Sequence, residues 1–330
     1  MCGILGYTMK EKPSAELIDG FRKLFILTQN RGHHASGIAW EKGGRTQHEK
    51  GAKAAREFVK GSGYKAFEKA RALTAVAHTR WATNGKPENN ENNHPHMTDS
   101  GSLALVHNGM VFNWEELAKR EKLPYNSECD SEVILRMIEK KLGRRSRRDA
   151  VKSAVKSAVR HISGSASFAL MNGASQTVFL VCHQNPVHIL VLPGQGVVFA
   201  SEASALWAVF GSKAKVLKMA EDTMLTITGD SYTTTRLSFA SYRVPVQHRA
   251  AYHGAATGGR AGRTETWWEQ EEREEKERRA ATAETFAGWY EPGLNDDTPP
   301  TDYMESRGLS IDPESGQIML PRERREAWGN

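Results

Sequence analysis

The sequence has few cysteines and no long apolar segment. Its 330 residues include only three cysteines, Cys2, Cys129 and Cys182. An odd number of cysteines this far apart argues against a disulfide framework and against clustered cysteine ligands for zinc. No stretch approaches the roughly 18 uninterrupted apolar residues that a membrane span requires, and the N-terminus lacks the residue order of a secretory signal. We therefore expect a cytoplasmic protein without a membrane partner, in which at least one thiol is reactive.

Composition sets only broad limits on function. Hydrophobic residues make up 39% of the chain and charged residues 25%, which is ordinary for a globular protein with a full core. The formal net charge of +6 permits contacts with nucleic acid without requiring them. Lys and Arg are concentrated among Val and Ala at residues 140–160. A solvated surface helix is the favoured interpretation of this basic stretch, and a docking face for a partner or polyanion is the alternative.

Short apolar runs and helical patterns predict an α+β sandwich. Residues 1–8 suit a buried strand, and Ser14 opens an amphipathic helix over 17–25. Further apolar runs predict strands at 37–40, 73–78, 103–107, 167–171, 178–182, 187–192, 197–200 and 224–228. Helical patterns lie at 114–121, 131–142 and 148–162. Because the helices are grouped between sets of strands, a doubly wound parallel sheet is disfavoured.

The character of the sequence changes near Val244, where the apolar runs stop. We place a domain boundary there, with one domain over 1–244 and a charged tail over 245–330. Charges alternate densely at 269–279, and 288–301 has the composition of a linker. Aromatic residues in this tail would either anchor it to a partner or hold an extended segment on the domain itself: Trp267, Trp268, Trp289 and Tyr290.

Cys2 is the first candidate for chemistry, because it begins the predicted first strand with only Met1 before it. The small residue at position 2 permits removal of Met1. The exposed α-amino group would then have a pKa of about 7.7 to 8.0, suited to taking the thiol proton directly or through water. Position alone is weak evidence, since a cysteine there is more often an inert small hydrophobic residue.

Polar residues follow two of the predicted strands. Arg80 and Trp81 come just after the run 73–78, and the planar guanidinium of Arg80 suits a carboxylate. Asn108 and Gly109 follow the run 103–107. The Asn108 side-chain NH₂ and the Gly109 backbone N–H could direct two donors at one developing oxyanion, each worth about 3 kcal/mol.

Asp130 precedes a predicted helix in the cluster Ser127-Glu128-Cys129-Asp130-Ser131-Glu132. From spacing alone, we prefer an N-cap role for Asp130 over a role in binding.

Together these clusters occur in a recognisable order. The blocks are Met1-Cys2-Gly3-Ile4, Arg31-Gly32 with Ser36-Gly37, His78-Thr79-Arg80-Trp81-Ala82-Thr83, His94-Pro95-His96, His107-Asn108-Gly109, Asp130 with Glu132, and Ala200-Ser201-Glu202. Their order resembles that of the N-terminal nucleophile (class II) glutamine amidotransferases, most closely the glutaminase domain of glucosamine-6-phosphate synthase. The string from His78 to Thr83 is the most specific block. This resemblance implies a four-layer αββα N-terminal nucleophile hydrolase fold.

The resemblance also implies the chemistry. Cys2 would be the nucleophile and its own amine the base, while Asn108 and Gly109 would hold the tetrahedral oxyanion. Glutamine would form a γ-glutamyl thioester, releasing ammonia first and glutamate after attack by water. The family uses no cofactor and no metal in this reaction, so none is expected.

Substrate-binding residues are carried over in the same way. Arg80, helped by Thr83, would hold the α-carboxylate of glutamine, and Asp130 would hold its α-ammonium. Trp81 would close the pocket so that ammonia leaves through the protein. The resemblance adds two further residues to the binding set: His94 and Arg31.

Departures from the family pattern qualify these expectations. Asn84 stands where a histidine is usual, which would tune substrate binding, and His34 stands where an aspartate is usual, which puts local polar contacts in doubt. The segment after Val244 is too short for a sugar-isomerase or phosphoribosyltransferase domain. A separate synthetase subunit is therefore implied as the ammonia acceptor, in nucleotide, modified-base or sugar metabolism, and a homo-oligomer stays open.

Two other functions compete with this interpretation. A non-catalytic glutamine-binding or scaffold protein of the same fold would act through the basic stretch and the tail. A nucleophile hydrolase acting on another amide would have no use for the pair of Arg80 and Asp130, so this pair disfavours it.

Overall fold

A computed structural model describes residues 2–143, 147–211, 215–240, 310–311 and 318–319 of the chain. Met1, the boundary expected near Val244 and nearly all of the tail 245–330 lie outside the described residues. Within that tail, β14 (Ser310–Ile311) and β15 (Ile318–Met319) pair with each other. No helix in the described ranges is long and apolar enough to cross a bilayer.

Thirteen further strands and seven α-helices build the rest of the described fold. The strands are β1 (Gly3–Met9), β2 (Ala35–Lys42), β3 (Arg45–Gly51), β4 (Thr74–Arg80), β5 (His96–Met97), β6 (Leu103–Val111), β7 (Gly164–Asn172), β8 (Thr177–Cys182), β9 (His188–Leu192), β10 (Gly196–Ala200), β11 (Val216–Lys218), β12 (Thr223–Thr228) and β13 (Ser231–Arg236). The helices are α1 (Ala15–Thr28), α2 (Ala55–Phe58), α3 (Ser62–Ala70), α4 (Trp114–Glu121), α5 (Asp130–Leu142), α6 (Arg148–Val159) and α7 (Ala203–Phe210).

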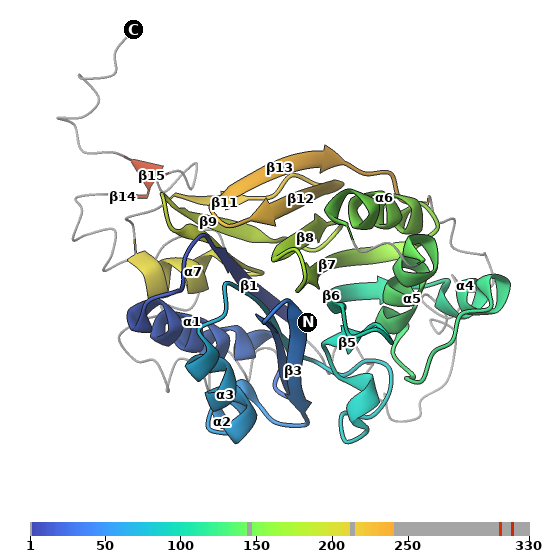
Figure 1. Ribbon diagram of the computed structural model, residues 1–330, viewed down its shortest axis with the longest axis horizontal. Coiled ribbons are helices and arrows are strands. Elements are labelled where there is room, and N and C mark those ends of the chain that lie inside the picture. The colour runs from blue at the N-terminus through green and yellow to red at the C-terminus, as the bar shows by residue number, and fades with distance from the viewer. Residues whose placement is uncertain (1, 144–146, 212–214, 241–309, 312–317, 320–330) are drawn as a thin grey trace, which may run out of the picture.

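The strands form two antiparallel sheets. A seven-stranded sheet has the order β11-β9-β10-β1-β4-β2-β3, and a six-stranded sheet has the order β13-β12-β8-β7-β6-β5. Strand β1 lies inside the first sheet, paired with β10 on one side and β4 on the other. Strand β1 therefore lies in the interior of this sheet, near the middle of the view in Figure 1.

Three apolar layers hold the sheets and helices together. Leu5 and Tyr7 of β1 face the core that packs against α1, α3 and α7, whereas Ile4 faces the core between the two sheets. This alternation follows from the two-residue period of a strand. Helices α4, α5 and α6 cover the outer face of the second sheet, as Figure 1 shows. The order of layers is helix, sheet, sheet, helix, which confirms the expected αββα sandwich.

Most predicted elements are present, with bounds that shift by a few residues. Ser14 caps α1 as expected, its Oγ accepting a hydrogen bond from the Leu17 N–H at 3.2 Å. Strand β3 was missed because it is a polar, largely exposed edge strand. Helices α2, α3 and α7 were missed as well, the first being only four residues long. The basic stretch 140–160 spans the end of α5 and all of α6, whose apolar residues are buried.

Candidate active site

Cys2 lies at the entrance to β1, where three strands of the first sheet have their ends close together. Gly3 is paired with Thr79 near the end of β4. On the other side, the Ser201 N–H, just past β10, donates to the Ile4 carbonyl at 2.9 Å. The fold therefore gathers the residues that follow β4 and β10 around the first residues of β1.

The Cys2 thiol is held by the backbone of Trp81. The Trp81 N–H donates to Cys2 Sγ at 3.2 Å, and the thiol donates to the Trp81 carbonyl at 3.4 Å. Burial raises the pKa of the Cys2 thiol above its usual value, and the Trp81 backbone hydrogen bond, Arg80 and Arg31 partly offset this rise. The thiol is therefore protonated near neutral pH, so its use as a nucleophile requires a base.

Arg31 supports the backbone of Cys2. Its side chain is buried, its Nε donates to the Cys2 carbonyl at 2.8 Å, and its guanidinium lies 3.5 Å from a Glu202 carboxylate oxygen. The sequence had placed Arg31 among the substrate-binding residues without a specific contact. The contacts of Arg31 hold the Cys2 backbone in place, and its role in substrate binding stays a prediction.

The two donors expected for an oxyanion lie on β6, in the second sheet. Asn108 is buried and donates from Nδ2 to Ser201 Oγ at 3.0 Å. The same Ser201 hydroxyl accepts the Ile4 N–H at 2.9 Å. Ser201 thus links the Asn108 amide directly to the strand that carries Cys2. Sequence reasoning quoted Ser201 within a family block but gave it no role.

Gly109, the residue after Asn108 on β6, has a backbone conformation that only glycine adopts readily. Its φ is +136°, and a Cβ at this position would lie 2.1 Å from the carbonyl oxygen of Ser165 on β7. Glycine therefore lets β6 approach β7 closely while Gly109 itself stays exposed. An exposed backbone beside Asn108 is the arrangement that an oxyanion site requires.

We expect Gly109→Ala to destabilise the protein by about 3 kcal/mol or more, since backbone strain adds to the clash with Ser165. Urea unfolding followed by circular dichroism measures this difference. Gly51→Ala is the matched control because nothing lies within 4 Å of its added Cβ, and it should change stability by less than about 0.5 kcal/mol. Equal stability of the two variants would contradict the described backbone of β6.

Arg80 is buried at the end of β4 and organises the loop that follows. Its guanidinium donates to Asn93 Oδ1 at 3.0 Å, to the Gly85 carbonyl at 3.0 Å and to the Asn84 carbonyl. Asn84, the departure from the family histidine, thus contacts Arg80 through its backbone. The expected grip of Arg80 on a carboxylate stays a prediction. Thr83, its expected helper, is exposed in the same loop.

Trp81 packs against the histidines of the loop between α1 and β2. Its ring centroid is 4.5 Å from that of His34 and 5.2 Å from that of His33. His34 Nδ1 also accepts the Ala82 N–H at 3.0 Å. The His34 imidazole therefore provides a hydrogen-bond acceptor at the position where the family has an aspartate. This polar contact is retained despite the substitution. Closure of the pocket by Trp81 stays a prediction.

Asp130 is not an N-cap, so this part of the sequence interpretation is wrong. Cys129 is the N-cap residue of α5, and Asp130 is the first helical residue. The Asp130 carboxylate is buried and accepts the Val111 N–H at 2.6 Å. The helix begins one residue earlier than predicted, and this bond connects its first turn to the end of β6.

Buried histidines lie beside these residues. His94 packs against His78 and His96, with ring centroids 4.1 and 4.7 Å apart. Burial lowers the pKa of His78 to about 3 and holds the pKa of His94 and His96 well below the usual value. His94 was expected to bind substrate, and this role stays a prediction.

The lowered pKa of His107 predicts that the free energy of unfolding depends on pH. Its ring contacts Ser131 Oγ at 2.7 Å, and burial lowers its pKa, although Asp130 opposes this shift. The unfolded chain binds a proton below about pH 6.5 where the folded chain does not, so stability falls as pH falls. His107 contributes up to about 1.4 kcal/mol per pH unit. Urea unfolding from pH 7.5 to 5.5 should show a shallower slope for His107→Gln than for wild type; equal slopes would contradict this assignment.

Comparisons with known proteins agree with this geometry. A family model described as "Glutamine amidotransferase domain" matches residues 78–208. The glutamine–fructose-6-phosphate aminotransferase of Aquifex aeolicus is 31% identical over 237 residues, covering 70% of this chain and 37% of the relative. The enzyme of the same name from Pyrococcus horikoshii is 38% identical over 146 residues, covering 43% of this chain and 23% of the relative. The chain thus spans well under half the length of these relatives.

A solved structure shares the fold. The glutamine phosphoribosylpyrophosphate amidotransferase of B. subtilis superposes with a TM-score of 0.57 at 25% identity, covering 72% of this chain and 49% of that one. This superposition agrees with the two antiparallel sheets and their helical layers.

Proposed function

Because this chain belongs to the class II, N-terminal nucleophile glutamine amidotransferases, we propose that it hydrolyses free L-glutamine to glutamate and ammonia through a thioester on Cys2. The observation that carries this proposal is the link from Cys2 to a donor in the other sheet. Arg31 and Trp81 hold Cys2, and Ser201 joins β1 to the Asn108 amide.

The chemistry begins with the proton of the Cys2 thiol. Removal of Met1 leaves the Cys2 α-amino group beside its own thiol, where it takes that proton directly or through water. Sulfur attacks the γ-carbonyl carbon of glutamine, and the oxygen becomes an anion that Asn108 Nδ2 and the Gly109 N–H stabilise. The C–N bond breaks as the α-ammonium returns the proton to the leaving nitrogen, releasing ammonia. Water then attacks the thioester, releasing glutamate and restoring the thiol.

Recognition of free glutamine rests on buried charges of opposite sign. Arg80 at the end of β4 and Asp130 at the start of α5 are each at least nine-tenths buried. In our proposal, Arg80 binds the α-carboxylate with Thr83, and Asp130 binds the α-ammonium. His94 supports the loop beside this pair, and Trp81 closes over the bound substrate. A glutamine side chain within a polypeptide lacks both charged groups, so it would be rejected.

The ammonia acceptor is the least constrained part of the proposal. The relatives named glutamine–fructose-6-phosphate aminotransferase are much longer than the matched region. We propose that ammonia passes to a separate synthetase that aminates or amidates a nucleotide, modified base or sugar. We assign hydrolysis to residues 1–244 and docking of that partner to the tail 245–330.

A glutamate-release assay on the purified full chain tests the proposed activity. We expect release from L-glutamine but not from Nα-acetyl-L-glutamine, which lacks the α-ammonium that Asp130 would bind. Release from both compounds would contradict the substrate clamp while leaving amide hydrolysis intact. Absence of release, together with saturable binding of glutamine, would instead support the non-catalytic binding protein.

A further inference from the structure

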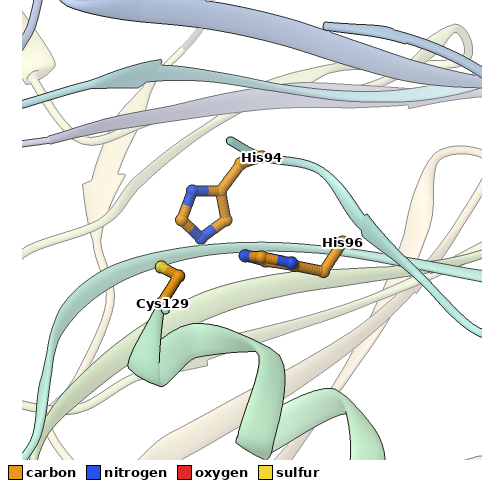
Figure 2. A group of neighbouring side chains, drawn as sticks. All are labelled: His94, His96 and Cys129. Carbon is orange, nitrogen blue, oxygen red and sulfur yellow. The ribbon is translucent and has the colours of Figure 1, made fainter. Parts of the chain in front are cut away.

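His94, His96 and Cys129 form a compact group of potential metal ligands. Each offers one ligand atom, and these atoms all lie within 4.8 Å of one another. Figure 2 shows the two rings and the cysteine side chain turned toward one another, with Cys129 at the start of α5. All three residues are at least 96% buried. The segment that carries His94 and His96 and the start of α5 therefore bring two imidazoles and a thiol together, away from solvent.

Three of the four ring nitrogens of this group lack a hydrogen-bond partner among the described residues. Neither Nδ1 nor Nε2 of His94 has a partner within the described part of the chain, and the same holds for Nε2 of His96. Buried polar atoms are almost always paired, so two adjacent rings with unpaired nitrogens call for a specific explanation. The Cys129 sulfur has a long contact of 3.9 Å to an Asp130 carboxylate oxygen and also interacts with the hydroxyl and backbone N–H of Ser131.

We propose that His94, His96 and Cys129 bind one divalent transition-metal ion, with zinc as the best match. Imidazole nitrogen and thiolate sulfur are the ligands that zinc prefers. Bond lengths of about 2.0–2.1 Å to nitrogen and about 2.3 Å to sulfur place tetrahedral ligand atoms roughly 3.3–3.7 Å apart. Small side-chain rotations would bring the three ligand atoms to this spacing. The fourth position is left for a small ligand such as water.

Metal binding at this site releases one proton. The Cys129 S–H bond is lost as the metal–sulfur bond forms, and the proton goes to solvent. Each histidine donates a lone pair and loses no proton. Charges of both signs act on the group. Arg80 acts on both histidines and on Cys129, Lys50 acts on His96, and the Asp130 carboxylate acts on Cys129.

The site would join two segments that carry the proposed glutamine clamp, and this consequence rests on the proposed function. His94 directly follows Asn93, whose side chain accepts a hydrogen bond from Arg80. Cys129 directly precedes Asp130. A bound ion would therefore fix the loop before β5 to the start of α5. The cysteine count alone could not reveal this site, because its other two ligands are histidines that meet Cys129 only in the folded chain.

A second acidic and histidine group serves as a comparison. His183, Glu221 and Asp222 also lie close together, but they are more exposed. His183 Nδ1 already contacts an Asp222 carboxylate oxygen at 2.6 Å, and its ring stacks on Phe239 at 3.8 Å. Because this group is already paired, we do not expect it to bind a metal with comparable affinity.

The test uses the full chain carrying Cys2→Ala, because a terminal cysteine with a free amine chelates metals by itself. Metal content after dialysis should be about one zinc ion per chain. Replacement by Co²⁺ should give a thiolate-to-cobalt band in the near ultraviolet and the strong visible bands of tetrahedral cobalt. Adding Cys129→Ser should remove the near-ultraviolet band and lower metal content at least about tenfold, a loss typical of a missing ligand. Adding His183→Gln should change neither.

Protection of the thiol provides a second measurement on the protein without any ligand substitution. Zinc should slow alkylation of Cys129 by iodoacetamide at least about tenfold, because a coordinated thiolate is less accessible to the reagent. Cys182, an equally buried thiol, should show no such effect. The proposal is overturned if folded protein binds no stoichiometric metal, if the cobalt band survives Cys129→Ser, or if His183→Gln removes it. These readouts do not require glutamine hydrolysis, so the two proposals can fail separately.

Discussion

Cys2→Ala is expected to lower glutamine hydrolysis by about 10⁴-fold or more, the scale on which removal of a nucleophile acts. The sulfur is the only atom in our mechanism that bonds to the substrate carbon. The Cys2 side chain is partly exposed, so its loss should leave the stability of the fold nearly unchanged. Glutamate release, measured together with thermal unfolding, separates these two effects.

Cys182→Ala is the matched control for this prediction. Cys182 is a buried thiol between the two sheets, and its Sγ lies 3.5 Å from the Asn185 carbonyl. Its removal should lower stability modestly, and the rate should stay within about threefold of wild type because Cys182 takes no part in the proposed mechanism. Equal rates for Cys2→Ala and wild type would refute the assigned nucleophile.

Asn108→Ala is expected to lower kcat by about 10²- to 10³-fold with little change in KM, because the amide donates to an oxygen that is charged only in the transition state. The Asn108 amide is oriented by Ser201 Oγ. Ser201→Ala should therefore give a smaller loss of kcat, since the donor remains but its orientation is weakened. Steady-state kinetics on both variants measures these parameters.

The separate effects of Asn108→Ala on kcat and on KM distinguish stabilisation of the oxyanion from other roles of Asn108. A tenfold or larger rise in KM for Asn108→Ala with unchanged kcat would mean that Asn108 binds the ground state rather than the oxyanion. Asn185→Ala is a useful neighbouring variant because Asn185 Nδ2 donates to the backbone carbonyl of Asn108 at 3.4 Å rather than to its side-chain amide. Its kcat should stay close to that of wild type.

The layers of the fold could be predicted from the sequence because apolar periodicity records which faces are buried. Residues 114–121 were predicted as a helix with the bounds that α4 has. Strand β3 and helix α3 could not be predicted in this way. Polar residues dominate β3, an edge strand with one face toward solvent, and α3 buries only Tyr64 and Phe67.

In the candidate site, too, some features could be predicted from the sequence and others could not. Short motifs identified Cys2, Arg80 and Asn108, because each family block keeps its residues adjacent in sequence. The contacts that connect these blocks depend on pairings between distant strands, such as Ser201 with Ile4. No local pattern reports such a pairing, so the role of Ser201 became visible only in the folded chain. The contact between Arg31 and the Cys2 carbonyl was missed for the same reason.

Intact-mass spectrometry of the purified protein, before and after treatment with an electrophilic glutamine analogue, tests the nucleophile most directly. We predict a chain that lacks Met1 and gains one adduct, which peptide mapping locates on Cys2. Prior incubation with L-glutamine should slow the labelling, and Cys2→Ala should prevent it. Full glutamine hydrolysis by a chain that retains Met1, or an adduct located on Cys129 or Cys182, would contradict the role assigned to Cys2.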